Sequence, residues 1–117
     1  MIQWREIMKI PNNSLAIIHP DKLRGYLLDV EHKRGKSKAM LLHLFGYTPE
    51  RWQILENDLR QYHLTADVAT VRETPYGNRY EVRAFLKTLN GRSLLVHTVW
   101  QIDTGSEYPR FITLFPD

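Results

Sequence analysis

The feature that most constrains the fold is a change in the spacing of apolar residues near Ala66. Before this point, apolar side chains recur every three or four residues, which is the spacing of amphipathic helices. After it, apolar and polar residues alternate, which is the spacing of strands with one buried face. A chain that passes from helices to strands in this order is predicted to be an α+β domain, with N-terminal helices followed by an antiparallel sheet.

About three helices are expected before the change in spacing. The first covers residues 20–30, where a proline suits the first helical position. After a loop, the second is capped by Ser37 and ends at Gly46, as helices commonly do. The third covers residues 49–64, where a threonine, a proline and an acid together mark a helix start.

Four strands are expected after the change in spacing, and turn residues separate them. The segment 75–78 has the composition of a turn, and Asn90-Gly91 is a strong hairpin signal. The apolar segment 14–19 could add a short edge strand. The expected strands are residues 67–74, 79–87, 94–102 and 110–115. They predict a four-stranded antiparallel meander.

The length and composition favour a single domain over residues 1–117. The chain has no cysteine, which excludes disulfides, thiolate metal sites and a cysteine nucleophile. Residues 1–10 contain no apolar run typical of a signal peptide, and no stretch is long enough to cross a bilayer. We therefore expect a soluble, cytoplasmic protein that has no membrane partner.

The net charge is only +3, but the positive charge is locally concentrated. Lys33, Arg34, Lys36 and Lys38 lie close together, without an acid between them, at the expected start of the second helix. Free backbone amides at a helix start attract anions, and a local cationic patch adds to this attraction. The alternative is a solvated basic loop. His32 precedes the segment and could transfer a proton near neutral pH, although loop histidines are often inert.

The third expected strand has two chemically different faces. Pleating places Thr98 with the apolar residues that should meet the helices, and His97 on the opposite face. His97 would then share the open face with Arg79, Arg83 and Lys87. A face with an imidazole and several cations could bind RNA. An ordinary polar outer face is the alternative.

The last strand adds a cation and a hydroxyl. Arg110 could bind a phosphate through its fork of donors, or it could pair with Glu107 or Asp103. Thr113 follows among apolar neighbours. This strand could therefore take part in the same site.

No metal ion or other cofactor is expected. The helices have no pair of histidines four residues apart, and the chain has no acidic cluster and no glycine-rich nucleotide loop. His43 and His63 fall between the core positions of their helices, so we expect them on solvated helix faces.

Several short motifs recur in an order that resembles a known family. They are Lys22-Leu23, Tyr26-Leu27-Leu28, His32, Gly35, Lys38-Ala39, Tyr76-Gly77, Thr98-Val99-Trp100 and Pro109-Arg110 with Thr113. Over about residues 13–115 the chain resembles an uncharacterised bacterial domain. That domain occurs at the C-termini of large filamentous-haemagglutinin-type adhesins and other polymorphic toxins, and as small free-standing proteins.

The resemblance implies a toxin-like domain similar in layout to the barnase, EndoU, colicin and RelE-type ribonucleases. These enzymes cleave RNA without a metal, and tRNA is a common target. Short stand-alone versions resemble toxins that are encoded beside a small antitoxin. The implied partners are therefore RNA and a small acidic antitoxin or immunity protein. The chain departs from the family pattern at His97, where the family often has an arginine.

We therefore expect a metal-independent endoribonuclease of toxin type. The candidate catalytic residues are His32 or His97 as the base, Lys38 and Arg110 for charge stabilisation, and Thr98 and Thr113 for orientation. The candidate RNA-binding residues are Lys33, Arg34, Lys36, Arg79, Arg83 and Lys87. The alternatives are a non-catalytic module that binds RNA or a protein, and a toxin fold without activity that persists as a structural or immunity protein.

Overall fold

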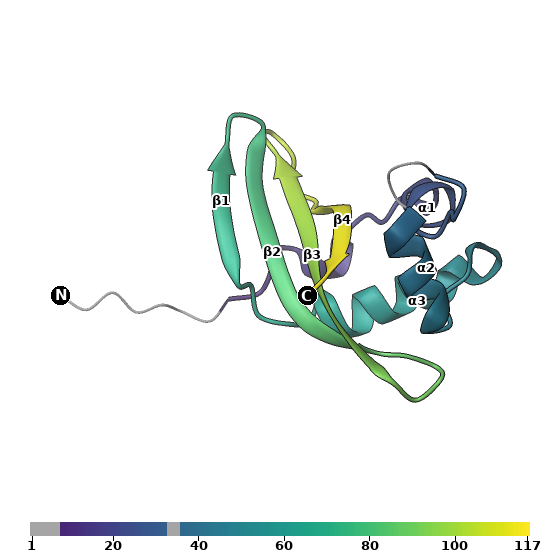
Figure 1. Ribbon diagram of the computed structural model, residues 1–117. Helices are drawn as coiled ribbons and strands as arrows, with labels where there is room; N and C mark the ends of the chain where they lie inside the picture. Colours follow the sequence, from purple (N-terminus) through teal and green to yellow (C-terminus); the bar gives the residue numbers. More distant parts are fainter. Residues whose placement is uncertain (1–7, 33–35) are drawn as a thin grey trace.

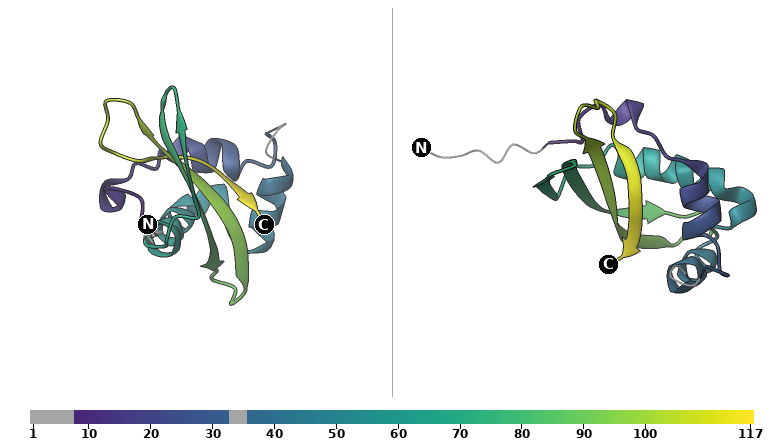
Figure 2. Two further views of the ribbon diagram at one scale, coloured as in Figure 1. Left: turned by 90° about the vertical axis from the view of Figure 1, so that its left-hand side faces the viewer. Right: turned by 90° about the horizontal axis from the view of Figure 1, so that it is seen from above.

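The computed structural model describes residues 8–32 and 36–117 and has the α+β fold that the sequence predicts (Figure 1). The helices are gathered at one side of a four-stranded sheet, and β1 lies at the edge farthest from them (Figures 1 and 2). The helical elements are η1 (Asn13–Leu15), α1 (Pro20–Lys22), η2 (Leu23–Leu27), α2 (Lys36–Leu44), η3 (Pro49–Arg51), α3 (Trp52–Asp58) and η4 (Leu59–His63). None of these helices is long and apolar enough to span a membrane.

The sheet has the expected antiparallel order β1-β2-β3-β4. Its strands are β1 (Thr70–Thr74), β2 (Gly77–Lys87), β3 (Ser93–Asp103) and β4 (Arg110–Pro116). The strand considered over residues 14–19 does not form as a regular strand. Instead, Ile17 makes a single parallel bridge with Arg110, beside the start of β4.

Both long predicted helices contain a π-turn that the apolar spacing did not indicate. The first helix combines α1 with the π-turn η2, and the third helix ends in the π-turn η4. In η4, the Leu64 N–H donates to the Leu59 carbonyl at 3.0 Å. Leu59 and His63 are four residues apart, so they lie on the same side of the helix, and both are buried. The prediction that His63 lies on a solvated face is wrong: its side chain is buried against the sheet, where it bonds Thr98 and the Ala84 carbonyl. The second helix begins at Lys36, so Ser37 lies within it and is not its cap.

The core lies between the helices and one face of the sheet. It consists of aliphatic and aromatic side chains from the helical region and from β2, β3 and β4. They include Ile10, Ile18, Leu23, Leu27, Leu28, Leu42, Tyr47, Leu55, Leu59, Tyr80, Val82, Leu86, Val96, Trp100, Phe111 and Leu114. The alternate residues of the strands point away from the helices and form the face that we call the open face.

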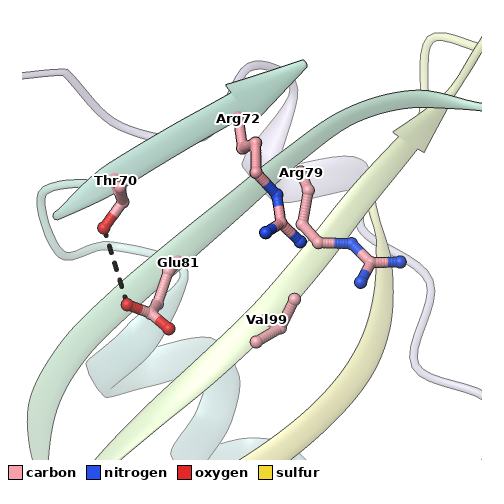
Figure 3. A pocket seen from close by; sticks show the side chains of 5 residues that line it. All are labelled: Thr70, Arg72, Arg79, Glu81 and Val99. Atoms are coloured by element: carbon pink, nitrogen blue, oxygen red, sulfur yellow. Dashed lines mark hydrogen bonds between the residues drawn. The ribbon is translucent and has the colours of Figure 1, made fainter. Parts of the chain in front are cut away.

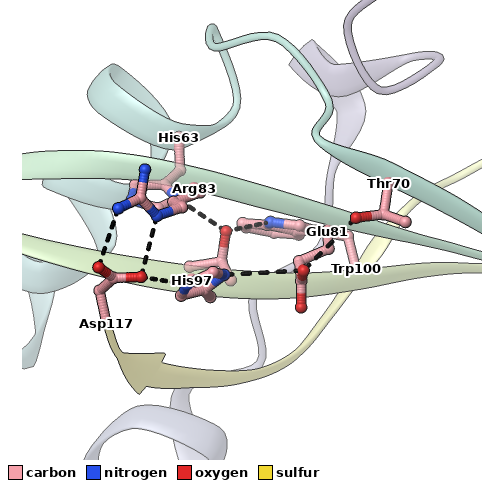
Figure 4. A network of polar contacts seen from close by, with 8 residues as sticks. His63, Thr70, Glu81, Arg83, His97, Trp100 and Asp117 are labelled. Atoms are coloured by element: carbon pink, nitrogen blue, oxygen red, sulfur yellow. Dashed lines mark hydrogen bonds and ion pairs between the residues drawn. The ribbon is translucent and has the colours of Figure 1, made fainter.

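A buried hydrogen-bonded group ties η4 to the sheet (Figure 4). His63 Nε2 lies 3.1 Å from the carbonyl of Ala84, so this nitrogen carries the proton and donates it. In the neutral ring, Nδ1 then accepts from the Thr98 hydroxyl at 2.7 Å, and the same hydroxyl accepts from Trp100 Nε1 at 2.8 Å. His63 and Thr98 are fully buried. Each polar group is thus satisfied only while the imidazole stays neutral.

Protonation of His63 should destabilise the fold. Burial lowers the pKa of His63 from 6.5 to about 4. As the pH falls below 6.5, the unfolded chain binds this proton before the folded chain does. We predict that the free energy of unfolding falls between pH 6.5 and 4, with up to about 3 kcal/mol attributable to His63.

Urea unfolding of the wild type and of His63→Gln across this pH range measures the effect. The variant has no group to titrate at this position, so the difference in unfolding free energy between the two proteins should narrow as the pH falls. Parallel curves for the two proteins would show that His63 is not the responsible group.

Gly77 starts β2 in a conformation that only glycine adopts readily. Its φ is 135°, and an added Cβ would collide with the backbone carbonyl of Ile102 on β3. Gly91, in the β2–β3 turn, also has a positive φ of 82°, but nothing lies within 4 Å of a Cβ there. Substituting each glycine by alanine therefore separates the energetic cost of backbone strain from that of a steric clash.

We predict that Gly77→Ala destabilises the protein by roughly 3 kcal/mol or more, because both strain and the clash apply. Gly91→Ala should cost only about 1 kcal/mol, since strain alone applies. Thermal or urea unfolding of both variants tests this order. Equal losses of stability would contradict the proposed steric constraint at Gly77.

Candidate functional site on the open face of the sheet

The strand register arranges the polar residues of the open face in rows across the sheet. His97 shares this face with Arg79, Arg83 and Lys87, as alternation along the strands predicts. The three rows nearest the centre are Arg72–Arg79–Gln101–Arg110, Thr70–Glu81–Val99–Thr113 and Arg83–His97–Phe115. Cations, a carboxylate and hydroxyls are therefore neighbours on one surface.

A chain of polar contacts links strands across this face (Figure 4). The Thr70 hydroxyl donates to Glu81 at 3.5 Å, and Glu81 Oε1 lies 3.6 Å from His97 Nδ1. His97 Nε2 lies 2.7 Å from Asp117 Oδ1, and the Arg83 guanidinium donates to both oxygens of Asp117 at 2.9 Å. We call these five residues the open-face network. Hydrogen bonds from Arg83 and His97 lower the pKa of Asp117, so its carboxylate stays charged at neutral pH.

His97 is held tightly within this network. Its ring stacks on Phe115, with centroids 4.8 Å apart and an angle of 7° between the ring planes. Nδ1 is buried and has no hydrogen-bond partner in the described part of the chain, while Nε2 bonds Asp117. Both ring nitrogens thus face carboxylates. In this arrangement His97 holds Asp117 and lies beside Glu81 rather than presenting a free nitrogen to a ligand.

A hollow of about 260 Å³ lies beside the network (Figure 3). It is lined by Thr70, Arg72, Arg79, Glu81 and Val99. Arg79 donates to the side-chain oxygen of Gln101 at 2.7 and 3.2 Å, which fixes its guanidinium. Arg72 is exposed and, among the described residues, has no hydrogen-bond or ion-pair partner. The hollow therefore presents one carboxylate and two guanidinium groups around an apolar floor.

Lys38 reaches the opposite end of the same row from α2. Its Nζ lies 3.4 Å from Oγ1 of Thr113, which is paired with Val99. Burial lowers the pKa of Lys38. Glu81 and Thr113 are on strands two apart, so their Cα atoms are roughly 10 Å apart. A small anionic group over Val99 would lie between the Glu81 carboxylate and the Lys38 ammonium.

Two of the other candidate catalytic residues do not line this hollow. Thr98 is buried in the core, where its hydroxyl bonds His63 and Trp100, so it does not reach the open face. Arg110 pairs with Asp103 at 2.7 and 3.1 Å, which is one of the alternatives considered from the sequence. Arg110 also lines a second hollow, of about 380 Å³, between α1 and β4.

His32 lies on the helical side of the molecule, between η2 and α2. Its ring is edge-on to Tyr26, with centroids 4.7 Å apart, and its amide donates to the Asp29 carbonyl at 3.1 Å. Lys36 is exposed at the start of α2, and Lys87 is exposed near the β2–β3 turn. Lys33 and Arg34 lie outside the described residues. The structure therefore brings together Lys38 and Thr113, and places His97 on the same face.

The sequence interpretation missed four contributors to this site, which are Arg72, Glu81, Phe115 and Asp117. Glu81 alternates with Arg79 and Arg83 along β2, so the strand pattern alone could have placed it on the open face. The contact of Asp117 with His97 had no comparable signal, because it depends on how β4 pairs with β3.

Comparisons with known proteins give a family but no functional relative. No curated protein and no solved structure matches the chain. Residues 9–117 match a family described as a domain of unknown function, DUF6883. This match spans nearly all of the described fold, so the chain belongs to the DUF6883 family.

Proposed function

We propose that the chain is a metal-independent endoribonuclease of toxin type, and that its site is the row from Glu81 to Lys38 on the open face. The observation that carries the proposal is the shared hollow in which the Glu81 carboxylate faces Arg72 and Arg79. Lys38 lies beyond the Val99 floor. A carboxylate opposed by three cations suits a phosphodiester with a neighbouring ribose hydroxyl.

The proposed reaction needs only groups that lie on this face. The Glu81 carboxylate accepts the proton of the ribose 2′-hydroxyl, and the 2′-oxygen bonds to the adjacent phosphorus. The bond from phosphorus to the 5′-oxygen then breaks, and the 5′-oxygen takes a proton from the Lys38 ammonium. The products are a 2′,3′-cyclic phosphate and a free 5′-hydroxyl. Proton exchange with water restores Glu81 and Lys38.

The surrounding residues have positioning and electrostatic roles. Arg72 and Arg79 stabilise the negative charge on the phosphate oxygens as the phosphorus becomes pentavalent. The Thr70 hydroxyl bonds Glu81 on one side, and the His97 ring lies 3.6 Å from Glu81 on the other. The base role first considered for His97 passes to Glu81, because both nitrogens of His97 face carboxylates.

We also propose two binding partners for the protein and its location in the cell. RNA, with tRNA as the first substrate to test, is the expected substrate. A small acidic antitoxin or immunity protein is the expected partner, because acidic side chains would complement the exposed cations Arg72 and Lys87. We place the protein in the cytoplasm, where it would encounter both the RNA and the antitoxin or immunity protein.

Cleavage of total tRNA by the purified protein in EDTA tests the proposal. We predict that the wild type yields fragments with 2′,3′-cyclic phosphate ends. Glu81→Gln should lower the cleavage rate at least about 100-fold, because the amide cannot accept the proton. The matched control is Glu73→Gln, which alters an exposed acid of β1 on the opposite side of that strand. Intact tRNA with the wild type, or equal rates for Glu81→Gln and wild type, would refute the proposal.

A non-catalytic RNA-binding module is the second candidate. The observation that favours it is that Arg79, Arg83 and Arg110 are all held by partners within the chain. Side chains fixed in this way shape a binding surface without performing a reaction. On this reading, Glu81 is a structural member of the network.

The salt dependence of affinity identifies phosphate contacts without requiring cleavage. For a single-stranded oligonucleotide, the logarithm of the binding constant should fall linearly with the logarithm of salt concentration. We predict that Lys38→Ala reduces that slope by about 0.7, since one phosphate contact is lost. An affinity for the oligonucleotide that does not change with salt would show that no phosphate is contacted and would contradict both RNA-based candidates.

A further inference from the structure

An exposed aromatic side chain extends the open face beyond the proposed site. Phe85 lies near the end of β2, close to the turn that leads to β3, and is 54% exposed. It is opposite Leu95, and the next row contains the stacked rings of His97 and Phe115. Together, Phe85, Leu95 and Phe115 form an apolar strip on a face that is otherwise polar.

Cations flank this strip on the same strand. Arg83 precedes Phe85 by two residues and Lys87 follows it by two, so alternation along β2 places all three side chains on the open face. Both cations are exposed; Arg83 is paired with Asp117, whereas Lys87 has no hydrogen-bond or ion-pair partner among the described residues. A flat apolar ring between two cations is the arrangement that receives a nucleobase and its adjoining phosphates.

The distance from the proposed site suits a continuous strand of nucleic acid. Glu81 and Phe85 are four residues apart on β2, which corresponds to roughly 13 Å along the strand. A short single-stranded segment can span this distance, with its cleaved phosphate over Val99 and a neighbouring base over Phe85. A base within a duplex is already stacked and paired, so it cannot lie flat on the ring.

We infer that Phe85 is a base-stacking platform and that the RNA bound on the open face is single-stranded. This inference rests on the proposed function for the site, and it adds the conformation of the substrate. A protein partner that covers the same strip is the competing explanation. It requires an apolar side chain at position 85 but not an aromatic one.

The experiment compares three substitutions at Phe85 using a short 2′-O-methyl oligonucleotide, which lacks the 2′-hydroxyl and so binds without being cleaved. We expect Phe85→Ala and Phe85→Leu to weaken single-strand binding about 5- to 150-fold, because stacking is lost. Phe85→Trp should retain the affinity, and the new tryptophan should lose fluorescence when the oligonucleotide binds. Binding of a duplex of the same sequence should be unchanged by all three substitutions.

Leu89→Ala provides the matched control, since Leu89 is 66% exposed in the adjoining turn but is not part of the strip. Phe85→Leu with wild-type affinity would overturn the platform, as would equal effects of Phe85→Ala and Leu89→Ala. Cleavage of unmodified RNA by the wild type is measured in parallel.

Wild-type cleavage combined with unaltered binding by the Phe85 variants would overturn the platform and leave the ribonuclease standing. Binding that depends on Phe85 without any cleavage would support the platform and overturn the ribonuclease. A wild type that binds no oligonucleotide would overturn both.

Discussion

The hydrogen-bonded group of His63, Thr98 and Trp100 determines which face of the sheet is available. It lies between η4 and the centre of the sheet, and each of its polar atoms is satisfied by another member or by the Ala84 carbonyl. Breaking one contact would leave a buried polar group without a partner, which is costly in a core. This requirement fixes the helices against one face. The alternate residues of the same strands must then face away from the helices.

The side chains of the open face are held by ion pairs and ring stacking, not by a buried hydrogen-bonded group. It has charged and aromatic contacts, including the pair of Arg83 with Asp117 and the stack of His97 on Phe115. These contacts are partly exposed, so they add little to stability. Together with the bonds from Thr70 to Glu81 and from Arg79 to Gln101, they order the side chains of this face. A site that is already ordered loses less conformational entropy when it binds.

The fold was predictable to the extent that local patterns determine it. The change in apolar spacing and the Asn90-Gly91 turn were enough to predict helices followed by an antiparallel meander. The π-turns were not predictable from the spacing of apolar residues. The sequence placed His63 on a solvated face because the partners that bury it, Thr98 and the Ala84 carbonyl, lie on strands distant in the chain.

The candidate site was only partly predictable. Alternation correctly put His97 and Arg83 on one face, but it carries no information on which charges pair. Arg110 illustrates this, since its partner Asp103 was one of several acids within reach. The contact of Lys38 with Thr113 joins residues 75 positions apart, so the spacing of residues along the chain gave no sign that Lys38 lies at the row through Val99.

Methyl NMR tests directly whether nucleic acid binds the open face over Val99. Val99 lies on the open face, whereas Val82 and Val96 are buried against the helices. On addition of a 2′-O-methyl single strand, we predict that the Val99 methyl signals shift and show contacts with ribose protons, while those of Val82 and Val96 stay in place. Unchanged Val99 signals, with shifts confined to Ile17 beside the second hollow, would contradict this prediction.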